Sequence, residues 1–327
     1  MLKLQFINVG NGDATLIEQG KDGCTFRILI DTGRPDVGAS EGSLRQTCAE
    51  YLRGRGIRKI DVLVITHLHM DHFGGLRDLI GEVEFGELYA AFIPGLPGQC
   101  IPEEPDAVKT VRGMIDCVNR WSADVAALCS TGCRPHEVGR SVRLDLPGNL
   151  SAEIIGSDAA LHRLQRTVWN GMATGQSFTD DEKYRASKSR NPGSLRVRLR
   201  YAGREIEIAG DRYGELWENA ATPCDILKVP HHGDAKSMTP QLTRNLRPRY
   251  AVISCMREYV EKKDRPSMQA IRLLRENGAR VWFTDAFDDG ENPPQFHRAV
   301  EFLLTDDRII HNSNQPGVNE NDYECTV

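Results

Sequence analysis

Short apolar runs separated by turn residues recur along the chain, and they predict strands interspersed with helices. Leu2–Val9, Ala14–Glu18 and Phe26–Ile30 predict three strands near the N-terminus. Ile60–Thr66 is a continuous apolar run between polar residues, which is typical of a buried strand. Further strands are predicted at Glu87–Ile93, Val142–Leu146, Ala152–Ile155, Ser194–Tyr201, Arg204–Ala209, Ile226–Val229, Tyr250–Ser254 and Arg280–Thr284.

Helical spacing of apolar residues appears between these runs. Ser43–Arg55 has this spacing and stops before Gly56, a residue suited to the end of a helix. Further helices are predicted from Asp106 to about Leu128 and at Tyr213–Ala220, Pro240–Leu246 and Ser267–Glu276. Strands lead, helices follow, and the pattern comes round twice, which predicts an α/β sandwich of two mixed sheets flanked by helices.

The predicted sandwich forms one domain over residues 1–311. Within it, Ser157–Pro192 is polar with few turn or strand signals, and we expect an insertion or a flexible lid there. The Asn/Gly/Glu-rich residues 312–327 are expected to form a flexible tail.

Composition places the chain among ordinary globular proteins. Its 327 residues are 40% hydrophobic and 27% charged, and the formal charge of -5 indicates no overall attraction for a polyanion. No apolar run reaches the roughly 18–20 residues that cross a bilayer, and the N-terminus reads as a strand, so we expect a cytoplasmic protein without a membrane partner. The nine scattered cysteines indicate reduced thiols.

Five of the nine histidines fall in two clusters, and the first carries the strongest chemical signal. In an extended segment residues i and i+2 point the same way, so His67 and His69 can hold one cation. A turn at Met70 would bring Asp71 and His72 to a second position. Imidazole and carboxylate suit zinc, manganese or iron. A surface histidine cluster without a metal is the plain alternative. The two clusters are 67–72 (HLHMDH) and 230–233 (PHHG).

These motifs resemble those of the metallo-β-lactamase-fold hydrolases, and within them the soluble hydrolase domain of ComEC-like DNA-uptake proteins. The matching segments run through most of the chain: Val9–Ala14 (VGNGDA), Leu29–Gly33 (LIDTG), Thr66–Gly75 (THLHMDHFGG), Asn191–Leu195 (NPGSL), Gly210–Asp211 and Lys228–Gly233 (KVPHHG). The resemblance implies a sandwich of the metallo-β-lactamase type, with helices outside two sheets.

The resemblance also implies two divalent ions, zinc or manganese. His67 and His69 would hold the first ion, which is expected to be the weaker site, and Asp211 would bridge the two. The second ion would be held by Asp71 and His72 together with a histidine after Val229. We favour His231 for that position because it is nearer the strand end, which leaves His232 to contact substrate or donate a proton.

Other residues of these motifs are expected around the ions. Asp31 would orient a ligand histidine, and Asp13 would lie near the metals in the opening turn, unless it only completes a glycine turn. Asn191 and Ser194 of the NPGSL segment are candidate substrate contacts.

Two departures from the family pattern bear on the site. The superfamily usually adds a histidine to the first metal from a loop before the bridging aspartate, and here only His136 and His162 lie in that interval, outside any recognisable motif. Arg265-Pro266 stands where the ComEC-like group tends to have His-Pro. Arg265 would contact a phosphate, or it is a solvated arginine before a helix.

Basic residues gather locally despite the net negative charge. Arg196, Arg198 and Arg200 would share one face of a strand, either as a groove that follows a nucleic-acid backbone or as the wet face of an edge strand.

Together these features predict a dinuclear phosphodiesterase, most simply a nuclease that cleaves DNA or RNA with metal-activated hydroxide. Asp71, His232 and Asp211 are the expected catalytic residues. The alternatives are a hydrolase of a small substrate (cyclic nucleotide, thioester or lactam) and a non-catalytic, metal-stabilised binding subunit. A protein partner or a homo-oligomer is compatible with either.

Overall fold

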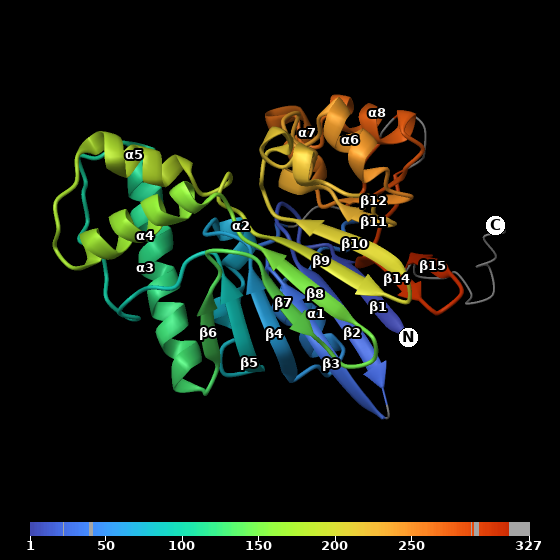
Figure 1. Ribbon diagram of the computed structural model, residues 1–327, viewed down its shortest axis with the longest axis horizontal. Coiled ribbons are helices and arrows are strands. Elements are labelled where there is room, and N and C mark those ends of the chain that lie inside the picture. Colours follow the sequence, from blue (N-terminus) through green and yellow to red (C-terminus); the bar gives the residue numbers. More distant parts are fainter. Residues whose placement is uncertain (22, 39–41, 289, 291–293, 314–327) are drawn as a thin grey trace.

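Two mixed β-sheets pack face to face in the computed structural model, which describes residues 1–327 except 22, 39–41, 289, 291–293 and 314–327 (Figure 1). The predicted fold is therefore confirmed. The predicted tail lies almost wholly outside the described residues, apart from Asn312 and Ser313, which end the last strand.

The first sheet has eight strands in the order β15-β14-β1-β2-β3-β4-β5-β6. Its antiparallel half leads into a parallel half from β3 to β6. The strands are β1 Leu2–Ile7, β2 Thr15–Lys21, β3 Cys24–Ile30, β4 Lys59–Ile65, β5 Glu84–Ala90, β6 Arg134–Glu137, β14 Ala299–Leu304 and β15 Ile309–Ser313.

The second sheet has seven strands in the order β13-β12-β11-β10-β9-β8-β7. Strands β7 to β10 are antiparallel, and β10 to β13 are parallel. The strands are β7 Val142–Asp145, β8 Ser151–Ile155, β9 Arg196–Tyr201, β10 Arg204–Ala209, β11 Ile226–Lys228, β12 Tyr250–Ile253 and β13 Arg280–Phe283.

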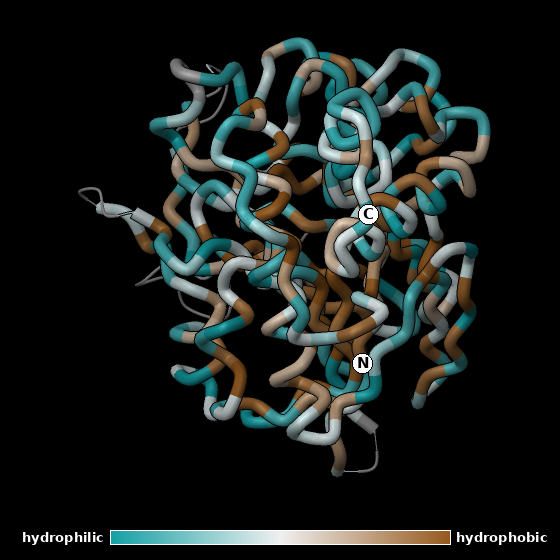
Figure 2. The backbone as a smooth tube through the Cα atoms, turned by 90° about the vertical axis from the view of Figure 1, so that its left-hand side faces the viewer, coloured by the Kyte–Doolittle hydropathy of each residue, from teal (hydrophilic) through white to brown (hydrophobic). Residues whose placement is uncertain are grey.

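Buried apolar residues form three clusters, one between the sheets and one on each outer face. The hydropathy colouring of the backbone in Figure 2 shows hydrophobic segments gathered in the interior. Helices cover the outer faces because each buries one apolar stripe against a sheet. Toward the first sheet lie α1 Cys48–Gly54, α2 Met70–Phe73, α3 Lys109–Ser130, α4 Ala159–Ala173 and α5 Asp180–Lys188, and toward the second α6 Pro240–Leu246, α7 Arg257–Lys263 and α8 Met268–Glu276. Short 3-10 turns lie at Leu76–Asp78, Gly214–Leu216, Glu218–Ala220 and Pro230–Gly233.

The segment 157–192, expected to be an insertion or flexible lid, forms the two helices α4 and α5. Val168, Trp169 and Met172 of α4 are buried in the core beside α3, and the Trp169 ring meets Phe92 edge-on at 4.9 Å between ring centroids. These three large apolar side chains at helical spacing anchor the insertion to the domain, and a lid function for it stays a prediction.

Several other boundaries differ from the sequence pattern. The predicted helix at Tyr213–Ala220 is two 3-10 turns, and the helix predicted from Ser43 begins only at Cys48, where Thr47 caps it. The sequence analysis missed two strands near the C-terminus, β14 and β15. β14 pairs with β1, almost 300 residues away in the chain, and only the tertiary fold creates that pairing.

The row of arginines on β9 does not form a groove. Arg196 and Arg198 are buried and paired with Glu207 of β10 at 2.6 and 3.1 Å, while Arg200 is exposed. The predictions of a nucleic-acid groove and of a wet edge strand are both wrong, because β9 lies between β8 and β10 inside the sheet and its charges neutralise those of its neighbour.

Stability at mildly acidic pH is expected to depend on His297. Its ring is buried, and burial lowers its pKa to about 4. Because an unfolded histidine titrates near pH ~6.5, acidification from there to about pH 4 protonates the unfolded chain but not the native one, and the free energy of unfolding falls. His297→Gln should show a smaller loss of urea stability over this window. Equal pH slopes in both proteins would contradict the prediction.

Two sequence expectations concern the chain as a whole. Among the described helices, none is long and apolar enough to cross a membrane. The described cysteines form no disulfide.

Candidate metal centre

The histidine signature begins at the C-terminal end of β4, with His67 and His69 between this strand and α2, and Asp71 and His72 in the first turn of α2. Asp13 N donates a hydrogen bond to Asp71 O at 3.0 Å, so the turn after β1 lies directly against the signature. A Cβ on Gly12 would come within 2.6 Å of the same carbonyl oxygen, so this close approach requires glycine. The opening turn and the signature are thus one structural unit.

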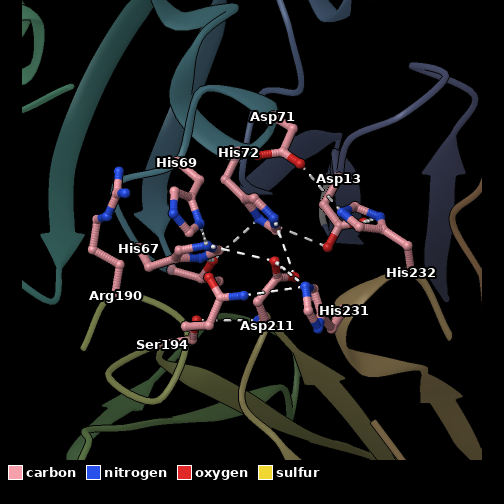
Figure 3. Close-up of polar contacts among 12 residues, drawn as sticks. Asp13, His67, His69, Asp71, His72, Arg190, Ser194, Asp211, His231 and His232 are labelled. Carbon is pink, nitrogen blue, oxygen red and sulfur yellow. Dashed lines mark hydrogen bonds and ion pairs between the residues drawn. The ribbon is translucent and has the colours of Figure 1, made fainter. Parts of the chain in front are cut away.

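Four carboxylates and five histidines converge at this place (Figure 3). The ligand atoms of seven of these residues form three compact groups, each with all atoms within 4.8 Å of one another. His67, His69 and Asp211 form what we call the first group. Asp71, His72 and His232 form the second group. The third group, Asp13, His72 and Asp211, overlaps both.

Asp211 lies between the two main groups, at the end of β10. Its Oδ1 is 3.2 Å from Nε2 of His72, and its Oδ2 is 3.6 Å from Nε2 of His67. One carboxylate oxygen therefore faces each group, which is the arrangement expected of a bridging ligand. Its backbone N–H donates a hydrogen bond to Ser194 Oγ at 3.1 Å, which holds the backbone from which the carboxylate extends.

Carboxylates lie behind the histidine rings of the second group, and the one behind His72 is within hydrogen-bonding distance. His72 Nδ1 lies 2.7 Å from Asp31 Oδ2, so its Nε2 faces Asp211. His232 Nδ1 lies 3.6 Å from Asp13 Oδ1, so its Nε2 faces Asp71 at 3.5 Å. A carboxylate behind one ring nitrogen is the usual support of a metal-binding histidine. Asp31 and Asp13 therefore lie where the sequence analysis expected them.

The two histidines of the PHHG turn face different parts of the centre. His231 and His232 both have left-handed φ values, 51° and 55°, which is costly for residues with a Cβ and concentrates at functional sites. The turn places His232 in the second group, whereas the sequence analysis favoured His231 there. His231 instead points its Nε2 at Asp211 Oδ2, 3.7 Å away.

Lys228 is a functional-site residue for which the sequence analysis gave no role. It is 1% exposed, lies on β11, and its ammonium group is in direct contact with the Asp13 carboxylate. The buried lysine neutralises one carboxylate of the cluster. The only signal in the sequence is the KVPHHG segment, where a lysine stands inside an apolar strand.

The three predicted substrate contacts differ in their surroundings. Asn191 lies at the centre, with Nδ2 3.1 Å from Nε2 of His231. Arg265 is partly exposed and paired with Asp234 at 3.2 Å. Ser194 is fully buried and holds the Asp211 backbone, so it positions the bridging carboxylate rather than touching a substrate.

Neither histidine of the intervening segment joins the centre. His136 lies against Glu87 at 2.7 Å and stacks on Tyr89, while His162 lies 3.1 Å from Glu137. In the described part of the chain, the first group therefore gains no histidine from this interval.

Burial and charge set the protonation of the cluster. Burial lowers the pKa of His67 well below its usual value, and burial together with Arg190 lowers that of His69 to about 3, so both rings are neutral. His67 Nε2 and His69 Nδ1 lie 2.9 Å apart, so one ring donates a hydrogen bond to the other. Burial alone would also lower the pKa of His72, but the carboxylates of Asp211 and Asp31 raise it well above the ordinary value. His72 thus occupies a place where positive charge is favoured.

The donor set fits divalent cations. His72 Nε2, Asp211 Oδ1, Asp13 Oδ1 and both ring nitrogens of His232 are buried without a hydrogen-bond partner in the described structure. Buried carboxylates normally require compensating positive charge. Among the described residues, Lys228 is the only lysine or arginine within hydrogen-bonding distance of the four carboxylates of the centre, and it contacts Asp13. The first and second groups would hold one cation each, and Asp211 would contact both.

Asp31→Asn is expected to weaken cation binding at the second group by about 10–100-fold, because the amide no longer fixes the ring of His72 as a carboxylate does. Binding of Zn²⁺ to the metal-free protein, followed by calorimetry, measures the change. Asp61→Asn is a suitable control, since Asp61 accepts a backbone hydrogen bond from Arg27 elsewhere on the sheet. Unchanged affinity in Asp31→Asn would show that Asp31 does not support a ligand.

Comparison with known proteins agrees with this geometry. Residues 7–105 match the family model described as "Metallo-beta-lactamase superfamily". The chain is 24% identical over 297 residues to ComE operon protein 3 of Bacillus subtilis (strain 168), covering 86% of this chain and 32% of that protein. It is 34% identical over 91 residues to the anti-Pycsar protein Apyc1 of Saccharibacillus brassicae, covering 26% of this chain and 32% of that protein. The chain thus spans about a third of the length of these relatives.

Solved structures with similar folds include two with TM-scores of 0.47. The metallo-beta-lactamase fold protein YhfI from Bacillus subtilis is 11% identical and matches 92% of this chain and 99% of its own. Tm1679, described as a metal-dependent hydrolase of the beta-lactamase superfamily, is 12% identical and matches 94% of this chain and 100% of its own.

Proposed function

Since this chain contains a metallo-β-lactamase superfamily domain, a superfamily of metal-dependent hydrolases, we propose that it is a dinuclear phosphodiesterase, with DNA or RNA as the first substrates to test. The observation that carries the proposal is the Asp211 carboxylate, with one oxygen toward each ligand group. A pair of bound divalent cations supplies Lewis acidity and neutralises negative charge on a phosphodiester.

Residues beside the two groups support an anionic substrate. Arg190 is 7% exposed, next to His69, and its guanidinium donates to the carbonyl oxygens of Leu68 and Ser187. In the described structure it forms no ion pair with a carboxylate, so its positive charge is not cancelled by a direct contact. Such a charge favours an anion over a neutral lactam at the first group.

Two further positively charged side chains lie at the rim of the centre. Arg265 is 28% exposed at its side chain, and Lys236 extends over the ring of Tyr213, 5.8 Å from the ring centroid. Tyr213 in turn lies beside His231, with ring centroids 5.7 Å apart. In the proposal, this rim contacts the phosphate or base next to the scissile bond.

The chain's own residues divide the remaining work between them. Asp71 is partly exposed, with His232 holding its Oδ2 at 3.5 Å, so it can orient an entering water molecule. Asp31 and Asp13 hold the rings of His72 and His232 in place. The buried positions of these groups exclude bulk water from the charges and strengthen their interactions.

The test is hydrolysis by the purified protein with Mn²⁺ or Zn²⁺. Single- and double-stranded DNA, RNA, cyclic nucleotides and bis(p-nitrophenyl) phosphate form one panel, and a thioester and a lactam form the other. We expect cleavage of at least one phosphodiester, abolished in the His67→Ala/Asp211→Ala double variant. Activity confined to the thioester or lactam would overturn the phosphodiesterase assignment, and metal binding without any hydrolysis would favour a binding subunit.

A further inference from the structure

His231 is the histidine of the centre that belongs to neither ligand group, yet it is buried and directed inward. We infer that it serves the first cation position as a fourth protein ligand, beside His67, His69 and Asp211. The inference rests on the proposed two-cation centre, and it reassigns a residue that sequence reasoning attached to the second ion.

The carboxylate of Asp211 shows which position His231 faces. Oδ1 faces the second group, through His72 at 3.2 Å. Oδ2 is approached by His67 Nε2 at 3.6 Å and by His231 Nε2 at 3.7 Å. Figure 3 shows His67 and His231 on either side of this carboxylate. His231 therefore shares the oxygen that belongs to the first group.

A carboxylate also lies near the other ring nitrogen of His231, outside hydrogen-bonding distance. Its Nδ1 points toward Asp234 Oδ1 at 3.9 Å, and the second oxygen of Asp234 accepts a hydrogen bond from Arg265 at 3.2 Å. Behind His72 and His232, carboxylates occupy the corresponding position. A carboxylate on this side turns Nε2 toward the centre.

The number of protein ligands at the first cation position leaves room for His231. The first group has three protein ligands, whereas transition cations at nitrogen and oxygen sites take four or more. The second group has three ligands plus the Asp211 oxygen that faces it. The first group can therefore accept a fourth ligand, and His231 lies on the Oδ2 side of Asp211, which this group shares.

Asn191 competes with a cation for this nitrogen. Its amide nitrogen lies 3.1 Å from Nε2 of His231, and its Oδ1 has no hydrogen-bond partner. One imidazole electron pair cannot accept the amide hydrogen and bind a cation together. The first position is consequently weaker than its ligand set alone would make it, and Asn191→Ala should tighten it.

The left-handed backbone suggests the variant to use. His231 has φ 51°, a conformation that glycine adopts without strain, so His231→Gly removes the ring while relieving the turn. Binding of Co²⁺ to the metal-free full chain is followed by calorimetry and by visible absorption. His69→Ala identifies the binding event of the first group, and His72→Ala identifies that of the second.

We expect His231→Gly to weaken the first event by at least about tenfold and to leave the second within about twofold. The intact second event proves in the same sample that the variant is folded, and His162→Ala, a histidine paired with Glu137, controls for loss of an imidazole elsewhere. Weakening of the second event instead, or no change in either event with only a higher KM, would overturn the inference. If Co²⁺ binding at the first group were unchanged or weaker in Asn191→Ala, the proposed competition between Asn191 and the cation would be overturned.

The metal readout separates this inference from the proposed function. If the two Co²⁺ binding steps change as expected but no phosphodiester is cleaved, the role of His231 stands and the phosphodiesterase assignment is rejected. Cleavage together with a first event unaffected by His231→Gly would do the reverse.

Discussion

Asp211→Ala is expected to reduce hydrolysis by about a thousandfold and to lower the number of tightly bound cations. Asp211 is the one side chain in which each carboxylate oxygen faces a different ligand group, 3.2 Å from His72 and 3.6 Å from His67. Its loss removes a ligand from both positions and also the negative charge that favours cations there. Steady-state hydrolysis of bis(p-nitrophenyl) phosphate and metal analysis of the same preparation measure the two effects.

The matched control for this prediction is Asp211→Asn, which keeps the shape and one oxygen but loses the charge. It should retain more bound metal than Asp211→Ala and little more activity. Asp145→Ala on the exposed strand β7 controls for removal of a carboxylate elsewhere. Full activity in Asp211→Ala would mean that the reaction takes place at another site.

Lys228→Met is expected to destabilise the metal-free protein by about 3–5 kcal/mol. Lys228 is 1% exposed and in direct contact with Asp13, which is also buried, so the substitution leaves a buried carboxylate without its cation. The free energy of unfolding in urea measures the loss. The double variant Asp13→Asn/Lys228→Met removes both charges, and we expect it to be more stable than Lys228→Met alone.

A surface ion pair provides the control for Lys228. Lys59 and Glu84 are 3.0 Å apart, with about half of each side chain exposed, so Lys59→Met should cost far less stability than Lys228→Met. If Lys228→Met cost no more than Lys59→Met, the Lys228–Asp13 contact would not be a stabilising buried pair.

Local sequence patterns were sufficient to predict the strands that precede the metal-binding residues. β4 and β10 were predicted within a residue of their ends, because a continuous or alternating apolar run bounded by turn residues is a local property. The sequence could not predict helices α4 and α5 as packed elements, since α5 is highly charged and the apolar stripe of α4 becomes evident only where Trp169 meets Met114 of α3.

The arginines of β9 illustrate a second limit. Alternation placed Arg196 and Arg198 correctly on one face of a strand. Their partner Glu207 lies on the next strand. Whether that face meets water or a neighbouring layer depends on the 3-10 turns at Gly214–Leu216 and Glu218–Ala220 on either side of Trp217, whose ring lies 4.2 Å from the Arg196 guanidinium. Charge along a sequence does not report burial.

The sequence by itself determined the fold class and the residues that converge on the centre, because the spacing of His67, His69, Asp71 and His72 and the glycine turns are local chemical requirements. Only the tertiary structure decided how these residues divide between two positions. The contact of Asp13 with Lys228 and the opposite facing of His231 and His232 join segments more than 200 residues apart, and they depend on backbone angles and strand pairing that no local pattern encodes.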